Sequence, residues 1–569
     1  MMKPHTLQMQ IQAARNVILP ELVIKNVKIV NLFTDEIEQA DVAIHNGVFV
    51  GIGDYKGERE IDGSPYTMVP GLIDAHVHIE SSMLSPSRFQ HVVLPKGVTS
   101  IVTDPHEIAN VTGTKGIDWM LADSEGCMMN YYYQLPSCVP ATSFEDNGAT
   151  LTAADLQTYY GKKNVLGLAE VMDFPAVLSG QEAMMEKLTS AINHGVPVDG
   201  HGAGLSGKDV NAYLAAGITT DHECVKPEEL IERVRRGMYV MLREGSAARN
   251  LHDLLKGYRK EMSNRLLFCT DDKHIDDLLE EGSVDFHVRE CLKAGIDIYS
   301  VLRMASLNAA QCYNLKGKGA VAPGYDADFI LLSDIDTFEV ASVWVGGERY
   351  EAEEEQSASG EFENTVVLGD YHQELLKLPM TSKHARVIEI IPNSIVTKNA
   401  EYPVTVEDGL FVPDTKEDLV KIAVVERHKG LGSVGVGIVK GFQLQSGAVA
   451  TTIAHDSHNI ICIGTNDRDM DAAIRELERI GGGITVVGEG AVKSSLSLPV
   501  GGLMTTVSAQ ELNDNYNELL EGLKEIGITT AFSPLLTLSF LALPVIPSLK
   551  LTNQGLFDVN TFSFVDVSI

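Results

Sequence analysis

Apolar and polar residues alternate over residues 22–70, beginning with Leu22-Val-Ile-Lys-Asn-Val-Lys-Ile-Val. A period of two predicts β-strands with one buried face, and Asn46-Gly predicts a hairpin turn between two of them. The same alternation returns after Gly319, in Asp328-Phe-Ile-Leu-Leu. We therefore expect the segments on either side of the middle region to pair in one small β domain.

Within residues 71–315, eight short apolar runs alternate with helical stretches, and each run ends in polar residues. One helical stretch shows the pattern well, because Val284, Val288 and Cys291 share a helical face and Gly295 is placed to end the helix. Eight short strands with mostly helical connections predict an α/β fold, a (β/α)8 TIM-type barrel with its active site at the C-terminal ends of the strands. The runs begin at Leu72, Ser100, Met128, Val165, Val196, Ile218, Met238 and Leu266.

A further region follows an acidic connector without periodic pattern, residues 351–363. An apolar stripe of helical spacing runs from Met470 to Ile480 in this region, and Gly481-Gly-Gly closes it. Strand-like runs surround the stripe, so we predict an additional C-terminal α/β or α+β domain. The predicted divisions are residues 1–70 for the first part of the β domain, 71–318 for the barrel, 319–364 for the returning β segment and connector, and 365–569 for the C-terminal domain.

The chain carries 78 Asp and Glu residues against 45 Lys and Arg residues, a formal net charge of −33. Nucleic acid is therefore not an expected partner, because its binding would build up repulsion. Residues 1–20 hold no apolar run of signal-peptide length, and the uncharged residues 531–549 contain three prolines that would break a spanning helix. We expect buried strands and turns there, and no membrane contact. Seven cysteines without a C-x-x-C pair predict a cytoplasmic protein.

The polar ends of the runs supply residues that can bind metals. His76 and His78 lie two apart, so on a strand both imidazoles face the same way. Glu170 ends the fourth run and is either a surface residue or a carboxylate that bridges two cations. His201 and His222 end the fifth and sixth runs, and each is either a ligand or a buried histidine bound to a backbone carbonyl.

Asp271 and Asp272 end the last run, and the sequence does not tell which of the two faces inward. Since the ends of barrel strands meet at one rim, we expect the four histidines, Glu170 and Asp271 to converge there. Two divalent ions would bring four positive charges against three negative ones, from the two carboxylates and one hydroxide. Water bound to such ions loses a proton near neutral pH, and Asp271 could pass that proton to a leaving group.

Several motifs resemble those of a known family. Pro70-Gly-Leu-Ile-Asp-Ala-His-Val-His is similar to the opening motif of the amidohydrolase superfamily, and Gly324-Tyr-Asp-Ala-Asp-Phe-Ile-Leu-Leu looks like the β segment that follows its barrel. The resemblance extends over nearly the whole chain to the bacterial adenine deaminases. It rests on His76-Val-His-Ile-Glu-Ser-Ser-Met, Thr103-Asp-Pro-His-Glu-Ile-Ala-Asn-Val, Gly167-Leu-Ala-Glu-Val-Met, Asp199-Gly-His-Gly-Ala, Cys269-Thr-Asp-Asp and His455-Asp-Ser-His-Asn.

This resemblance implies hydrolytic deamination of adenine to hypoxanthine and ammonia, a reaction of purine salvage, at a site with two divalent metal ions. Mn²⁺ is the expected metal, with Fe²⁺ and Zn²⁺ as alternatives. Many members of the superfamily bridge their ions with a carbamylated lysine, whereas Glu170 stands at that place here, which argues against dihydroorotases and hydantoinases. The H-x-E and P-C-x-x-C pattern of cytidine deaminases is absent from the sequence. Carried over by position, the metal ligands are His76, His78, Glu170, His201, His222 and Asp271.

The expected mechanism is attack of a metal-bound hydroxide on C6 of adenine, with Asp271 relaying a proton to the departing ammonia. Glu80 is a candidate for protonating N1, and is otherwise a solvated loop residue. His106 contacts the substrate, supports a ligand, or caps a turn. His455 and His458 are a further metal site, a cover for the barrel mouth, or surface histidines.

A different activity on the same barrel stays open as an alternative, namely hydrolysis of a cyclic amide or of another aminated heterocycle, because this fold hosts many reactions. A non-catalytic descendant is not expected, since none of the six ligand positions has lost its residue. Adenine, a small molecule, is the expected partner. The sequence leaves open whether the chain forms homo-oligomers.

Overall fold

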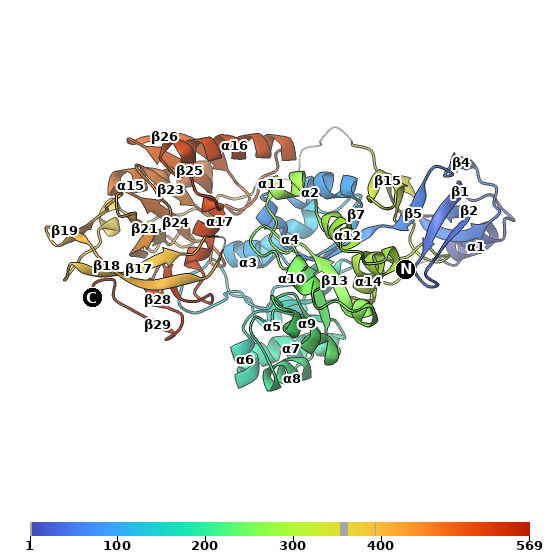
Figure 1. Ribbon diagram of the computed structural model, residues 1–569, viewed down its shortest axis with the longest axis horizontal. Helices are drawn as coiled ribbons and strands as arrows, with labels where there is room; N and C mark the ends of the chain where they lie inside the picture. The colour runs from blue at the N-terminus through green and yellow to red at the C-terminus, as the bar shows by residue number, and fades with distance from the viewer. Residues whose placement is uncertain (1–2, 353–361, 393) are drawn as a thin grey trace.

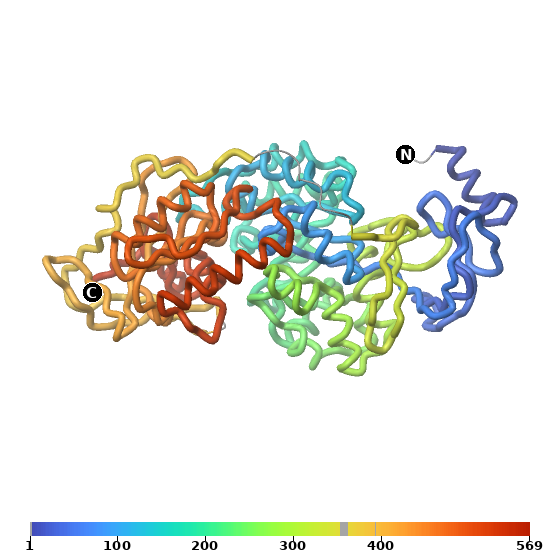
Figure 2. The backbone as a smooth tube through the Cα atoms, turned by 90° about the horizontal axis from the view of Figure 1, so that it is seen from above, coloured from blue at the N-terminus to red at the C-terminus, as the bar shows by residue number. Residues whose placement is uncertain are grey.

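The computed structural model describes residues 3–352, 362–392 and 394–569, and its elements fall into three groups along the longest axis of the molecule (Figures 1 and 2). A β sheet made from the segments that flank the middle region lies at one end. The middle region lies in the centre, and the C-terminal residues lie at the other end. The predicted connector, residues 351–363, falls mostly outside the described residues.

The sheet at one end of the molecule combines strands from both sides of the middle region. Its strands are β1 (Leu22–Asn31), β2 (Glu36–His45), β3 (Val48–Gly53), β4 (Arg59–Asp62), β5 (Thr67–Pro70), β14 (Phe329–Asp334), β15 (Glu339–Val345) and β16 (Glu348–Arg349). The order is β16-β15-β14-β5-β1-β2-β3, with β4 beside β1. The two flanks join where Ile330 lies opposite Val69. β2 and β3 form the predicted hairpin, in which Asn46 and Gly47 both have positive φ angles, 50° and 72°.

Parallel strands of the middle region occur at the eight predicted runs. They are β6 (Leu72–Val77), β7 (Val98–Thr103), β8 (Asn130–Leu135), β9 (Val165–Val171), β10 (Val198–Gly200), β11 (Thr220–Asp221), β12 (Tyr239–Arg243) and β13 (Leu266–Cys269). One sheet has the order β10-β9-β8-β7-β6 and the other the order β11-β12-β13. The Asp271 N–H donates to the His76 oxygen at 3.0 Å, and the Thr219 N–H donates to the Val198 oxygen at 3.3 Å. These bonds link the two sheets at both edges, so the strands form a curled parallel sheet.

Helices connect most of these strands, in agreement with the alternating pattern of the sequence (Figure 1). They are α2 (Pro86–Val93), α3 (His106–Thr112), α4 (Thr114–Asp123), α5 (Ala153–Gln157), α6 (Phe174–Ser179), α7 (Glu182–His194), α8 (Lys208–Ala215), α9 (Pro227–Arg235), α10 (Leu251–Leu255), α11 (Ile275–Glu280), α12 (Val284–Lys293), α13 (Ile298–Leu302) and α14 (Asn308–Cys312). Helix α1 (Pro4–Ala14) packs on the sheet at the end of the molecule. In α12, Val284, Val288 and Cys291 are buried, and Gly295 follows the helix with a φ of 81°.

The C-terminal residues form a second large sheet. Its order is β18 (Thr397–Pro403), β17 (His384–Ile390), β22 (Val434–Lys440), β21 (Leu419–Val425), β24 (Ile460–Gly464), β23 (Ala448–Thr451), β25 (Gly483–Gly488) and β26 (Ala491–Ser497). Smaller sheets pair β19 (Thr405–Glu407) with β20 (Leu410–Val412), and β27 (Leu549–Thr552) with β28 (Gly555–Asp558) and β29 (Ser563–Phe564). Helix α15 (Asp467–Ile480) buries Met470 and Leu477 and ends at Gly481, as predicted, and α16 (Ala509–Glu525) packs beside β26.

Residues 531–549 differ from the predicted buried strands and turns. The Ser533 side chain caps the start of helix α17 (Pro534–Ser539), and Pro534 is its first residue. A serine cap followed by proline favours the start of a helix. The segment is therefore a short helix and a 3₁₀ turn, Phe540–Ala542, that lead into β27. None of the described helices has both the length and the apolar character needed to cross a membrane.

The C-terminal part packs against the middle region. Leu84 and Thr505 form a parallel β-bridge between the two parts. The Asn553 amide donates to the Asp146 carboxylate at 2.7 Å. One hydrophobic cluster runs through both parts. Because of this packing, the loop between β23 and β24 reaches the polar ends of the parallel strands.

Candidate metal centre

Six of the side chains singled out in the sequence lie together beyond the ends of the parallel strands, and we call them the rim cluster. The rim cluster consists of His76, His78, Glu170, His201, His222 and Asp271. Five strands, β6, β9, β10, β11 and β13, carry or directly precede these residues. All six side chains are buried except that of His201, which is 22% exposed. The fold thus gathers residues that span almost 200 positions of the sequence, from 76 to 271.

The histidine pair at the end of β6 directs two nitrogens at one place. The Nε2 atoms of His76 and His78 are 3.1 Å apart. The Nδ1 atom of His78 lies 3.0 Å from the backbone oxygen of Asp104, to which it can donate. A proton held on Nδ1 leaves the Nε2 lone pair available for a cation.

Glu170 lies between two groups of histidines and offers one oxygen to each. Its Oε1 atom is 3.3 Å from His78 Nε2 and 3.8 Å from His76 Nε2. Its Oε2 atom is 2.6 Å from His201 Nδ1 and 3.1 Å from His222 Nε2. This arrangement suits a carboxylate that bridges two cations.

Asp271 faces the histidine pair. Its Oδ1 atom is 3.1 Å from His78 Nε2 and 3.6 Å from His76 Nε2. Its Oδ2 atom accepts a hydrogen bond from Arg243 Nη1 at 2.8 Å. The neighbouring Asp272 also lies near His78, and it accepts a hydrogen bond from the Ser81 hydroxyl at 2.5 Å.

The electrostatics of the rim cluster keep its two carboxylates ionised. Burial on its own would raise the pKa of Glu170, but the neighbouring His201 and His222 hold that pKa well below its ordinary value. Burial would also raise the pKa of Asp271, but the contacts with His76 and His78 outweigh it and lower that pKa. Ionised carboxylates, together with imidazoles that release their protons when a cation binds, form a donor set for divalent cations.

Comparisons with known proteins identify the family of the chain. Residues 67–350 match the Amidohydrolase family, and residues 394–563 match the Adenine deaminase C-terminal domain. The chain is 50% identical over 573 residues to the adenine deaminase of Geobacillus kaustophilus, with 99% of both chains covered. It is 49% identical over 554 residues to that of Bacillus licheniformis and 47% identical over 559 residues to that of Bacillus subtilis, with 96% of each chain covered in both cases. The chain belongs to the adenine deaminase family.

Membership in the adenine deaminase family confirms the family that the sequence motifs indicated. It also confirms the prediction of a metal-dependent hydrolase, because the matched residues 67–350 place the centre of the chain among the amidohydrolases. The rim cluster lies entirely within those residues.

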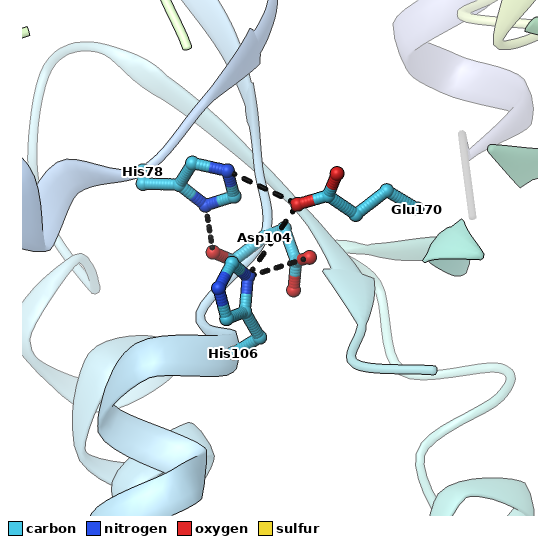
Figure 3. Close-up of side chains that lie close together, drawn as sticks. All are labelled: His78, Asp104, His106 and Glu170. Carbon is cyan, nitrogen blue, oxygen red and sulfur yellow. Dashed lines mark hydrogen bonds and ion pairs between the residues drawn. The ribbon is translucent and has the colours of Figure 1, made fainter. Parts of the chain in front are cut away.

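His106 and Asp104 extend the rim cluster of this adenine deaminase family member on one side (Figure 3). His106 Nδ1 lies 3.1 Å from Asp104 Oδ2 and 3.6 Å from Glu170 Oε1. Burial lowers the pKa of His106, but the charge of Asp104 outweighs it and raises the pKa to about 10. His106 is thus a buried group beside Glu170 and not a turn cap alone. Sequence reasoning gave Asp104 no role, although it directly follows the second apolar run.

Two further charged residues at the rim were not singled out in the sequence. Arg243, at the end of β12, contacts both Glu223 and Asp271. Glu223 Oε1 lies 3.6 Å from His222 Nε2 and 3.8 Å from His201 Nδ1. Both residues lie at or just after strand ends. The search for polar residues at strand ends, which identified the histidines, could therefore also have found them.

Glu80 is buried and not a solvated loop residue, since only 1% of it is exposed. Its Oε1 atom accepts a hydrogen bond from the Ile108 N–H at 3.3 Å, and its Oε2 atom has no hydrogen-bond partner among the described residues. Burial raises the pKa of Glu80. The side chain can therefore carry a proton beside the histidine pair.

A second group of side chains lies where the C-terminal part meets the middle region, and we call it the interface cluster. It consists of Glu107 in α3 and of His455 and His458 in the loop after β23. His455 Nδ1 is 3.5 Å from Glu107 Oε1, and His458 Nε2 is 3.9 Å from Glu107 Oε2. All three are buried, so His455 and His458 are not surface histidines.

Proposed function

We propose that the protein catalyses the hydrolytic deamination of adenine to hypoxanthine and ammonia. Support comes from the curated relatives, which carry the name adenine deaminase over 96–99% of this chain. The observation that carries the proposal in the structure is the position of Glu170, whose two oxygens face two separate histidine pairs. A site for two cations suits hydrolysis of a C–N bond in an aminated ring.

The residues of the rim cluster fit two divalent cations. His76, His78 and Asp271 would hold one cation, and His201 and His222 would hold the other, with Glu170 shared between them. Imidazole and carboxylate donors without a thiolate suit Mn²⁺ and Fe²⁺ as well as Zn²⁺. We propose Mn²⁺ as the metal.

In the proposed reaction, the carboxyl groups of Asp271 and Glu80 transfer the protons. When bound, the cations supply hydroxide near neutral pH for addition to C6 of the purine. Asp271, oriented by Arg243, takes a proton at the centre and hands it to the departing amino group. Glu80 delivers a proton to N1 while C6 becomes tetrahedral. One water is consumed, the bond from C6 to the exocyclic nitrogen breaks, and ammonia leaves.

His106 acts in this proposal as a positioning residue for Glu170, because its Nδ1 atom lies 3.6 Å from Glu170 Oε1. The curled sheet is proposed to be a closed (β/α)8 barrel over residues 71–318, flanked by the composite β domain of residues 1–70 and 319–364. Residues 365–569 form the proposed C-terminal domain. Seven free cysteines support a cytoplasmic location.

Ammonia release tests the proposed function directly. The protein is loaded with Mn²⁺ and incubated separately with adenine, adenosine and cytosine. Release from adenine alone is expected. Release from adenosine or cytosine with none from adenine would contradict the proposal, as would the absence of release from all three by protein with a full metal content.

A further inference from the structure

We propose that the interface cluster of Glu107, His455 and His458 is a third divalent-cation site, which ties the C-terminal part to the middle region. Two imidazoles and one carboxylate are a common donor set for Mn²⁺, Fe²⁺ and Zn²⁺ in proteins. The site lies outside the rim cluster and shares none of its residues.

The spacing of the donor atoms fits one ion. Atoms that each lie about 2.1 Å from a common ion are separated from one another by about 3.0–4.2 Å, depending on the angle between them. Glu107 Oε1 lies 3.5 Å from His455 Nδ1, and Glu107 Oε2 lies 3.9 Å from His458 Nε2, within this range. These separations are long for hydrogen bonds, so the three groups face one another without bonding directly.

Hydrogen bonds among the described residues satisfy these donor atoms only in part. His458 is fully buried, and its Nε2 atom has no hydrogen-bond partner in the part of the chain that the structure describes. Ser81 Oγ lies 3.3 Å from Glu107 Oε1 but only 2.5 Å from Asp272 Oδ1. A hydroxyl has one proton to donate, so Ser81 shares it between two carboxylates. The Glu107 carboxylate, 1% exposed, thus receives only the longer of the two Ser81 contacts.

Metal stoichiometry tests the proposal on the full-length protein. The chain is loaded with Mn²⁺, dialysed against buffer with low Mn²⁺, and analysed by mass spectrometry of the metal. Three equivalents are expected for the wild type and two for Glu107→Gln and for His458→Asn. The control is His45→Asn, which changes a buried histidine of β2 far from either cluster and should keep three equivalents. Two equivalents in the wild type, or three in both cluster variants, would overturn the proposal.

A second measurement does not depend on the folding of any variant. Crystals of the Mn²⁺-loaded wild type, measured at the manganese absorption edge, should give an anomalous peak between the Glu107 carboxylate and His458 Nε2. Full peaks at the rim cluster with none at the interface cluster would refute the site. Glu170→Gln separates this proposal from the proposed function, since it should lose the rim ions and retain the peak at the interface cluster.

Discussion

The rim cluster and the interface cluster both combine imidazoles with buried carboxylates, but different parts of the chain hold them in place. The rim cluster stands on strand ends of one curled sheet, and backbone groups orient its members, as the Asp104 oxygen does for His78. The interface cluster joins Glu107 to a loop more than 300 residues away in the sequence. Its geometry exists only while the two parts of the molecule are packed together.

Because of this difference, we expect the rim cluster to serve the reaction and the interface cluster to serve the packing of the two parts of the chain. Residues on rigid strand ends keep their geometry without help from other parts, which is what a reacting centre requires. A cluster between two parts of the chain instead couples ligand binding to the packing of those parts. Changes at the rim cluster should therefore act mainly on catalysis, and changes near the interface cluster mainly on stability.

The largest effect is expected for Glu170→Gln. Loss of the shared negative charge should remove the ions of the rim cluster and lower kcat about 1,000-fold or more. Adenine turnover and metal content measure the two effects together. Glu244→Gln is a matched control, because Glu244 is also buried and accepts a backbone hydrogen bond, from Leu251 at 3.1 Å, but lies outside both clusters. Wild-type activity and metal content in Glu170→Gln would show that Glu170 does not bridge.

Glu80→Gln should have the next largest effect. It should show that proton delivery and metal binding depend on different residues of the rim. The amide keeps the shape of Glu80 but cannot deliver a proton to N1, so kcat should fall about 100-fold. Metal content should stay at the wild-type level, unlike in Glu170→Gln. If turnover is unchanged, the proton for N1 has another source; if metal is lost as well, Glu80 supports the ions and not the substrate.

Much of the fold could be predicted because hydrophobic periodicity reports local structure. The apolar runs of the middle region became strands buried largely on both faces, and the stripe of α15 became a helix buried on one face. The prediction of buried strands and turns was wrong in part for residues 531–549, where a helix stands in place of the strands and turns follow it. Ser533 and Pro534 carry the stronger signal there, a helix start, which the apolar composition obscured.

One rule, that polar residues at strand ends form the site, predicted part of the candidate site. Side chains at the ends of parallel strands meet at one edge of the sheet. This rule identified the four histidines, Glu170 and Asp271. The rule also covers Asp104, Glu223 and Arg243, to which the sequence assigned no role. It does not reach Glu107, whose contacts depend on how a distant loop packs. No local pattern encodes that packing.

Arg427 provides a test of how the interface cluster is held. Its guanidinium is fully buried and donates to the backbone oxygens of His458 and Gly501 and to the Thr365 hydroxyl. Arg427→Lys cannot reach all three acceptors, so the free energy of unfolding should fall by about 2 kcal/mol. Chemical denaturation measures this change, and the Mn²⁺ content of the rim cluster should not change.

Arg475→Lys is the control for this substitution. Arg475 also bonds an acceptor, Asp471 at 3.0 Å, but it is half exposed on α15, so its replacement should cost less than about 0.5 kcal/mol. Equal losses in the two variants would mean that Arg427 does not hold the loop through its buried hydrogen bonds.

The smallest effect is expected at Glu145, which lies beside the interface and contacts Ser457 of the loop between β23 and β24. Burial raises the pKa of Glu145 from its ordinary value of 4.5 to about 8. The folded protein thus keeps a proton that the unfolded chain releases between these two values, and stability falls as the pH rises through that window. Glu145→Gln removes this contribution, so its Tm should match the wild type at pH 5 and exceed it by about 2 °C at pH 8. Parallel Tm curves from pH 5 to pH 8 would show that Glu145 does not hold a proton at the interface.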